Sequence, residues 1–278
     1  MCRVNGDAFA MRYQNKVVII TGGSKGIGEG CVRSFAEAGA KIVFCARGED
    51  DGQALVRDLD KRSGEVTFIS CDVTNLPALK DVVDQTIEMH GRLDCLINNA
   101  GWHPPHQPID DFSFDDFRGL FELNVMSIFA ACKFALPWLR QTGGNIINMS
   151  SLVGTMGQRH ATTYVATKGA ITAFTKALAI DESANKVRVN SVSPGNVFTP
   201  LWQEAIDAAT DPESCRRKGE AAQWLGRMGN IEEVGQLCLY IAAEATFSTG
   251  VDFIVSGGAE LGYGRKIDLA EPGEISRP

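Results

Sequence analysis

Short apolar runs alternate with amphipathic stretches along the chain from residue 16 onward. In the amphipathic stretches the apolar positions recur every three or four residues, which is the spacing of one face of a helix. The apolar runs are short, and the first of them, Val17 to Ile20, consists of β-branched residues that favour a buried strand. Strands are predicted at Val17–Ile20, Lys41–Cys45, Val66–Cys71, Leu93–Ile97, Asn145–Met149, Arg188–Val192 and Asp252–Val255. Helices are predicted near residues 26–38, 51–61, 76–90, 115–139, 163–183, 202–208 and 231–243.

This alternation predicts the fold class. Strands that are separated by helices pair in parallel, and their helical crossovers cover both faces of the sheet. No internal repeat, low-complexity run or linker divides the chain. We therefore predict an α/β fold: a single Rossmann-like doubly wound domain with a seven-stranded parallel sheet and helices on both faces. The domain is expected to span residues 13–264, between a flexible N-terminal extension (1–12) and a C-terminal tail (265–278).

The charge balance and the cysteines narrow the class of partner. The 278 residues include 27 Lys and Arg against 34 Asp and Glu, a net charge of −7, which argues against nucleic acid because basic patches hold phosphate backbones. No run approaches the roughly 18 consecutive apolar residues of a membrane helix, so no membrane is expected. The eight cysteines are scattered singly, without metal-ligand spacing. We expect no metal, no disulfide and a reducing, cytoplasmic location.

The stretch from Thr21 to Gly28, Thr-Gly-Gly-Ser-Lys-Gly-Ile-Gly, joins the first predicted strand to the first predicted helix. Glycines let the backbone approach a pyrophosphate closely, and the N–H groups at the start of the helix favour its negative charge. A glycine turn alone is a weak signal, because many such turns bind nothing. The candidate cofactor-binding residues here are Gly22, Ser24, Lys25, Gly26, Ile27 and Gly28.

The end of the second strand bears on the choice of cofactor. An acid at this position commonly binds the adenosine ribose and selects NAD. This chain has Ala46 and Arg47 instead, and the planar fork of Arg47 suits a 2′-phosphate. These residues favour NADP(H) over NAD(H), although Glu49 and Asp50 lie close enough to replace the missing acid. At the end of the third strand, Asp72 either accepts a hydrogen bond from the adenine amino group or caps the next helix.

The candidate catalytic residues follow the fifth strand. Ser151 stands at the strand end, and Tyr164 and Lys168 are four residues apart on one helix, so their side chains share a face. A lysine ammonium beside a phenol should lower the tyrosine pKa below its free value of about 10 and make it usable as an acid–base group. Asn124, in the preceding helix, is placed to anchor a water that leads to Lys168.

Together these residues resemble the short-chain dehydrogenase/reductase family over residues 16 to about 264. The resemblance is carried by Thr21-Gly22-x-x-x-Gly26-x-Gly28, Asn98-Asn99-Ala100-Gly101, Ser151, Tyr164-x-x-x-Lys168 and Pro194-Gly195. It implies an NAD(P)-dependent oxidoreductase that interconverts a secondary alcohol and a ketone. Within the family the chain looks most like the type 14 17β-hydroxysteroid dehydrogenases, although these are associated with NAD and carry Asp where this chain has Ala46.

The resemblance also implies roles for individual residues. Tyr164 would be the acid–base, Lys168 its pKa tuner and a ligand of the nicotinamide ribose, Ser151 the anchor of the substrate oxygen and Asn124 a support of the proton relay. Further cofactor contacts are implied at Val73, Asn99, Ala100, Gly101, Pro194, Gly195, Val197 and Thr199. Family members are usually dimers or tetramers, so we expect a homotetramer or a homodimer.

The substrate is less well defined by the sequence. The candidates for lining the substrate cleft are His103, Gln158, Trp202, Trp224 and Tyr263. A 17β-hydroxysteroid requires an apolar, aromatic pocket with polar ends. His103 and Gln158 would equally suit a polyhydroxylated ligand, and the resemblance implies an L-fucose-like sugar as the alternative substrate. His103 could also simply pack on the prolines of its own turn. A hypothesis from another class is a catalytically silent dinucleotide-binding regulatory protein.

Overall fold

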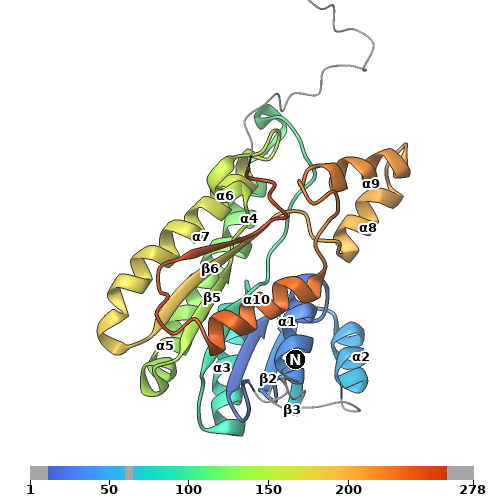
Figure 1. The fold of residues 1–278 in the computed structure, drawn as a ribbon. Coiled ribbons are helices and arrows are strands. Elements are labelled where there is room, and N and C mark those ends of the chain that lie inside the picture. The colour runs from blue at the N-terminus through green and yellow to red at the C-terminus, as the bar shows by residue number, and fades with distance from the viewer. Residues whose placement is uncertain (1–11, 60–64, 262–278) are drawn as a thin grey trace, which may run out of the picture.

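A single parallel sheet forms the centre of the molecule (Figure 1). The computed structural model describes residues 12–59 and 65–261. The strand order is β3-β2-β1-β4-β5-β6-β7, and every neighbouring pair is parallel. The strands are β1 (Val17–Thr21), β2 (Lys41–Ala46), β3 (Glu65–Ser70), β4 (Cys95–Asn98), β5 (Asn145–Met149), β6 (Arg188–Pro194) and β7 (Asp252–Val255). The predicted doubly wound α/β fold is confirmed.

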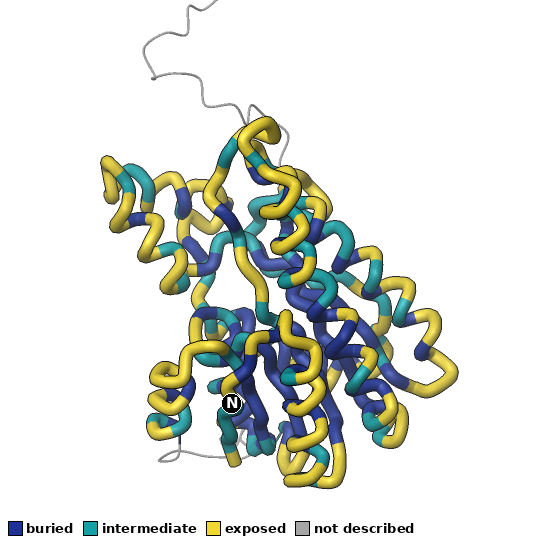
Figure 2. The backbone as a smooth tube through the Cα atoms, turned by 180° about the vertical axis from the view of Figure 1, so that it is seen from behind, coloured by how far each residue is buried: buried dark blue, intermediate teal, exposed yellow. Residues whose placement is uncertain are grey.

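Helices cover both faces of this sheet, and each face has its own apolar core. Phe35 and Leu239 pack α1 and α10 on one face, whereas Leu79, Leu139 and Ile171 pack α3, α5 and α7 on the other. Figure 2 shows the strands as buried backbone between helices whose outer sides are exposed. The helices are α1 (Gly26–Glu37), α2 (Glu49–Leu59), α3 (Leu76–His90), α4 (Phe114–Phe121), α5 (Ser127–Thr142), α6 (Val153–Met156), α7 (Thr162–Asp181), α8 (Pro200–Asp207), α9 (Pro212–Ala221) and α10 (Ile231–Ala243).

Several helical regions differ from the sequence-based prediction: the short α6 was not predicted, α2 begins two residues early, and two further regions differ more strongly. The helix expected at 115–139 consists of α4 and α5 joined by a π-helical turn, Glu122–Met126. Helix α9 was not predicted because its sequence is mostly polar; the side chain of Asp211 caps it by accepting a hydrogen bond from the Ser214 N–H (2.9 Å). The predicted extension (1–12) lies outside the described residues except for Arg12, and the predicted tail (265–278) lies outside them entirely.

The stretch Phe114–Thr142 is long and apolar enough, by length and composition alone, to cross a membrane. Half of its most apolar window is buried inside the fold, where α5 packs against α3, and α4 against α7. Packing in the core therefore accounts for its apolar character.

Strand β1 lies between β2 and β4, so the chain runs outward in opposite directions on its two sides. In doubly wound sheets this switch leaves a crevice at the carboxyl ends of the strands, where ligands bind. Helices α8 and α9 project beyond the sheet at the same end of the molecule as α6 (Figure 1). The topology therefore places the functional site at this end.

Candidate active site

The glycine turn between β1 and α1 is packed too closely for other residues. Gly22 and Gly26 have φ angles of +65° and +57°, which favour glycine. A Cβ placed on Gly28 would lie 2.0 Å from the carbonyl oxygen of Gly22, and one on Gly22 would lie 2.9 Å from the Cα of Ala100. Any side chain at Gly22 or Gly28 would therefore force the turn away from the sheet edge.

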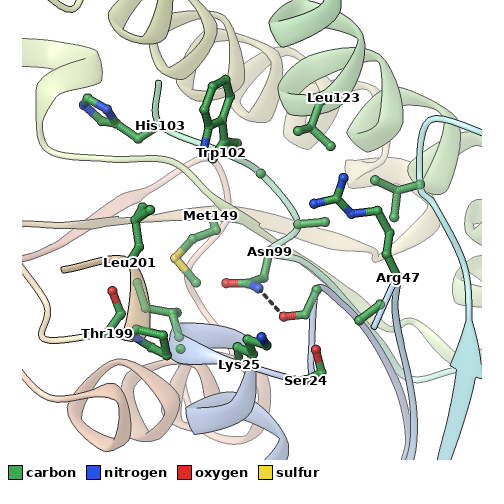
Figure 3. Close-up of a pocket in the computed structure, with 18 of the residues that line it drawn as sticks. Ser24, Lys25, Arg47, Asn99, Trp102, His103, Leu123, Met149, Thr199 and Leu201 are labelled. Carbon is green, nitrogen blue, oxygen red and sulfur yellow. Dashed lines mark hydrogen bonds between the residues drawn. The ribbon is translucent and has the colours of Figure 1, made fainter. Parts of the chain in front are cut away.

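Asn99, which follows β4, fixes this turn from the neighbouring strand. Its side-chain amide donates hydrogen bonds to the carbonyls of Thr21 (3.1 Å) and Gly22 (3.0 Å), and its backbone N–H donates to the Thr21 hydroxyl (3.0 Å). Figure 3 shows the Asn99 side chain in the cleft with one hydrogen bond of its amide. Asn98 points the other way and donates to the side chain of Asn148 (2.9 Å). The turn is thus held in one geometry by β4.

Ser151, Tyr164 and Lys168 meet in the wall of the same cleft. The Ser151 hydroxyl interacts with the Tyr164 phenol in the sense that lowers the Tyr164 pKa, and Lys168 Nζ lies 5.6 Å from the centre of the Tyr164 ring. Lys168, only 5% exposed, donates to the carbonyl of Met149 (2.8 Å) at the end of β5. The end of β5 and one face of α7 thus bring the three predicted catalytic residues together.

The electrostatics of this group differ from the prediction. Burial raises the pKa of Tyr164 to about 12, and the interaction with Ser151 offsets this only in part. Burial also lowers the pKa of Lys168 to about 8. The expected lowering of the Tyr164 pKa by Lys168 is therefore wrong for the chain by itself, because desolvation of the phenolate outweighs the other effects.

Asn124 lies in the π-helical turn and is fully buried. Its amide group donates to the Trp102 carbonyl (3.0 Å) and the Thr167 hydroxyl (3.1 Å), and its oxygen accepts from the Trp102 N–H (2.9 Å). Thr167 in turn donates to the carbonyl of Tyr164 (2.7 Å). These contacts join the loop after β4 to α7; the role of Asn124 in a proton relay stays a prediction.

His103 covers the Tyr164 ring, with ring centres 4.1 Å apart. Its Nδ1 lies 2.6 Å from the Pro104 carbonyl oxygen. Its Nε2 lies 3.1 Å from Oε1 of Gln158. His103 therefore does both things that the sequence analysis considered. It contacts a proline of its own turn, and it lines the cleft beside Tyr164. His106 lies beside it, and burial together with the neighbouring His103 and His160 lowers the pKa of His106.

The opposite end of the cleft is charged and open to solvent. Arg47 is exposed at the end of β2 and makes no hydrogen bond or ion pair with any described residue. Lys25 Nζ lies 2.8 Å from Oδ2 of Asp51 in α2. Asp72 accepts from the Thr74 N–H and hydroxyl; with a weaker contribution from Arg47, these bonds lower the pKa of Asp72. The helix that follows is capped by Asn75, so the capping alternative for Asp72 is wrong.

The cleft has a volume of about 540 Å³, and most predicted residues line it (Figure 3). Val197 does not, because it is buried in the core beside Gly229, and Trp202 does not, because its ring packs over Gly219 of α9. Trp224 is 74% exposed and lies outside the cleft, and Tyr263 lies outside the described residues. Gln158, Asn124 and Gly28 do not line the cleft themselves; Gln158 contacts the lining residue His103. The lining residues that the sequence analysis missed include Asp51, Cys71, Trp102, Leu123, Leu201 and Glu204.

Of these missed residues, Asp51 had a sequence signal, because it continues the acidic run from which Glu49 and Asp50 were chosen. Trp102 stands between the Asn-Asn-Ala-Gly turn and His103, which was a second usable signal. Leu201 and Glu204 enter from α8, whose position over the cleft depends on tertiary packing. The described part of the chain contains no cluster of His, Cys, Asp and Glu that could hold a metal ion.

The residues present fit a nicotinamide dinucleotide. The side-chain-free cradle at Gly22 and Gly28 opens onto the N-terminus of α1, which suits a pyrophosphate. From this turn the cleft extends to Asp72 and Val73 in one direction and to Lys168 and Tyr164 in the other. Pro194, Gly195 and Thr199 line the wall between the turn and the catalytic residues.

Known proteins with similar sequences and structures share this architecture. Residues 22–260 match the family model described as enoyl-(acyl carrier protein) reductase. The L-fucose dehydrogenases of Bos taurus and Mus musculus are 52% and 51% identical to the chain, over 96% of the chain and 97% of each relative. A cyclopentanol dehydrogenase of Comamonas testosteroni is 36% identical over 89% of the chain and 98% of the relative.

A solved structure extends this likeness to the fold. L-sorbose reductase from Gluconobacter frateurii, complexed with NADPH and L-sorbose, has a TM-score of 0.85 and 28% identity over 90% of this chain and 98% of the reductase. The expected specific likeness to type 14 17β-hydroxysteroid dehydrogenases is not supported, since the similar curated relatives are named L-fucose dehydrogenases. The cleft, the three predicted catalytic side chains and these relatives lead to one conclusion: the chain belongs to the short-chain dehydrogenase/reductase family and is an NAD(P)-dependent oxidoreductase that acts on CH–OH groups.

Proposed function

We propose that this protein is a sugar dehydrogenase that oxidises a hydroxyl-bearing ring carbon of an L-fucose-like substrate to a carbonyl. The observation that carries the proposal is the hydrogen-bonded pair His103–Gln158 directly beside Tyr164. A sugar has further hydroxyl groups next to the reacting carbon, and Nε2 of His103, which lines the cleft, can exchange its Gln158 partner for one of them. The relatives named L-fucose dehydrogenases support the same substrate class. The hydroxysteroid becomes the second candidate.

The cleft also has apolar surface at this end. Trp102, Leu123 and Leu201 line the cleft, and Trp102 lies beside His103 (Figure 3). L-Fucose carries a methyl group and a largely apolar ring face, which such side chains can cover. Polar groups on one side and apolar groups on the other are the combination that orients a small amphipathic ligand.

The work of the chain in this reaction is to hold the substrate oxygen and to move its proton. A bound nicotinamide dinucleotide supplies the hydride acceptor. Ser151 and Tyr164, which lie together in the cleft wall, hold the alcohol oxygen, and Tyr164 in its phenolate form takes the hydroxyl proton as the carbonyl forms. Lys168, protonated below pH 8, provides the positive charge that favours the phenolate. In the reverse direction Tyr164 returns the proton.

We propose NADP(H) as the preferred cofactor, with NAD(H) as the alternative. Ala46 places no acid at the end of β2, and Arg47 lines the cleft without an ion-pair partner among the described residues. A guanidinium in this position suits a 2′-phosphate. The NADPH in the sorbose reductase complex shows that this architecture accommodates the phosphorylated cofactor in that protein.

Replacing His103 tests the substrate class. His103→Asn should lower kcat/KM for L-fucose by about tenfold or more, because a ring hydroxyl loses its partner. It should lower kcat/KM for cyclopentanol, which has no second hydroxyl, by no more than about twofold. His160→Asn is the matched control, since His160 lies outside the cleft and asparagine tolerates its φ of +59°. An equal loss for both alcohols would show that His103 does not read the sugar hydroxyls.

A further inference from the structure

We call the end of the cleft at Lys25, Arg47 and Asp72 the adenosine end, because the adenosine of a dinucleotide is expected there. The end of β2 supplies no acid to it, but helix α2 supplies one. The first turn of α2 holds Glu49, Asp50 and Asp51, and of these three only Asp51 lines the cleft. Successive residues of a helix point about 100° apart, so one member of such a run faces the cleft while its neighbours face solvent. The structure thus selects one carboxylate from three.

The Asp51 carboxylate turns back toward the glycine turn. Its Oδ2 lies 2.8 Å from Nζ of Lys25, and a Cβ placed on Gly48 would lie 3.1 Å from the same oxygen. Gly48 follows Arg47, so the carboxylate lies over the turn that carries the guanidinium. One part of the cleft is therefore bordered by three charged residues from three segments: Lys25, Arg47 and Asp51.

The Lys25–Asp51 pair is weak enough to exchange partners. The side chains of Lys25 and Asp51 are 58% and 47% exposed, and ion pairs this open to solvent contribute little to stability. Lys25 can therefore leave for a phosphate at small cost. Asp51 stays in the cleft wall when Lys25 leaves, because it belongs to α2 and its helix N-terminus favours a negative charge there.

We infer that Asp51 is a specificity-determining residue that limits the preference for NADP(H) and lets the chain also use NAD(H), an inference that rests on the proposed function. A 2′-phosphate carries roughly −1.5 to −2 charges at neutral pH and is repelled by a carboxylate. The 2′-hydroxyl of NAD is instead a donor that a carboxylate accepts. Lys25 and Arg47 attract the phosphate, and Asp51 opposes them.

Equilibrium binding without any sugar tests this inference directly. The variants Asp51→Asn and Asp50→Asn remove the same charge from neighbouring positions of α2, and only the first faces the cleft. Affinities are measured by titration calorimetry for NADP+, NAD+ and the fragments 2′,5′-ADP and 5′-AMP, so that the contribution of the 2′-phosphate is isolated. Asp51→Asn should tighten NADP+ and 2′,5′-ADP by about tenfold relative to NAD+ and 5′-AMP, the effect of about one unit charge across about 6 Å at a half-exposed site. Asp50→Asn should change that ratio by less than about twofold.

Equal effects of the two variants, or equal effects of Asp51→Asn on NADP+ and NAD+, would overturn the inference. Lys25→Met removes the cation and leaves the acid, so it should weaken NADP+ several-fold more than NAD+; a tightening would also overturn it. The outcome is independent of the substrate. If the chain binds both cofactors as described but oxidises no sugar, the proposed function fails and the role of Asp51 stands.

Discussion

The two ends of the cleft hold their functional side chains in different ways. At the catalytic end, Lys168 is 5% exposed and bonded to a strand-end carbonyl, and burial moves the pKa values of both Tyr164 and Lys168. At the adenosine end, Lys25 and Asp51 are about half exposed and form one surface ion pair. We therefore expect the chemistry to depend on buried groups and the choice of cofactor to depend on solvent-exposed charges. Substitutions at the first end should change rates, and substitutions at the second should change which cofactor binds.

The largest effect is expected from Tyr164→Phe. The variant keeps the ring that His103 covers but loses the oxygen that takes the proton, so kcat should fall by about 10³-fold while the dissociation constants for NADP+ and NAD+ change by less than about twofold. Steady-state kinetics and calorimetric titration measure the two quantities. Tyr240→Phe, in α10 and outside the cleft, is the control. Substantial turnover in Tyr164→Phe would remove Tyr164 from the mechanism.

Lys168→Met should separate activity from stability. We expect kcat/KM to fall by about 10²-fold, because the positive charge beside Tyr164 is lost. A pKa of about 8, against 10.5 in a free lysine, corresponds to about 3 kcal/mol of burial cost. Loss of the hydrogen bond to Met149 offsets about 2 kcal/mol of this, so the variant should be about 1 kcal/mol more stable at pH 7.

The sign of this stability effect depends on pH. Because the pKa of Lys168 is lower in the folded protein than in the unfolded chain, the burial cost is fully present below pH 8 and disappears as the pH rises toward 10.5. The advantage of Lys168→Met should therefore shrink over this range in urea denaturation curves. Lys176→Met, exposed on the same helix, should show no such trend. A constant difference at all pH values would contradict the burial argument.

Asn99→Ala should affect both cofactors equally, in contrast to Asp51→Asn. It removes the side-chain hydrogen bonds to the carbonyls of Thr21 and Gly22 that fix the glycine turn. The affinities for NADP+ and NAD+ should each fall by about tenfold, and stability should fall by about 1–2 kcal/mol. Calorimetric titration and thermal unfolding test the two effects. A selective loss of NADP+ would mean that the turn, rather than the charges, discriminates.

The smallest effect is expected from salt. Raising the ionic strength from about 0.05 M to about 0.5 M should weaken NADP+ binding about threefold more than NAD+ binding, because the exposed charges of Lys25, Arg47 and Asp51 are screened. The value of kcat at saturating cofactor should stay nearly constant, because the charged member of the predicted catalytic group, Lys168, is buried. A salt-dependent kcat with salt-independent binding would invert the comparison between the two ends.

Most of the fold could be predicted from the sequence because its elements have strong local patterns. The strands at Asn145–Met149 and Asp252–Val255 and the helix at 76–90 begin and end as predicted. The π-helical turn at Glu122–Met126 could not be predicted, because it depends on the fit of Asn124 between Trp102 and Thr167. Helix α9 has no apolar periodicity, so it gives no hydrophobic signal.

The two ends of the site also differ in how far local sequence patterns determine the positions of their residues. Ser151, Tyr164 and Lys168 were predictable, because a strand end and a four-residue helical spacing place them regardless of loop geometry. Asp51 was missed in favour of Glu49 and Asp50, since the residue that faces the cleft depends on where α2 begins, and α2 begins two residues before its predicted start. The prediction that Trp202 lines the substrate cleft was wrong, because its ring packs on Gly219 of the neighbouring helix α9.

Whether the substrate is an L-fucose-like sugar can be measured directly as reduction of the cofactor by the purified wild-type protein. L-Fucose and a 17β-hydroxysteroid are each mixed with the protein and saturating NADP+ or NAD+, and the absorbance of the reduced nicotinamide is followed from the first turnover. We expect reduced nicotinamide to form with L-fucose, with a kcat/KM at least about tenfold above that for the steroid. Reduction by the steroid alone would contradict the sugar assignment, and no reduction with either alcohol would contradict the proposed function.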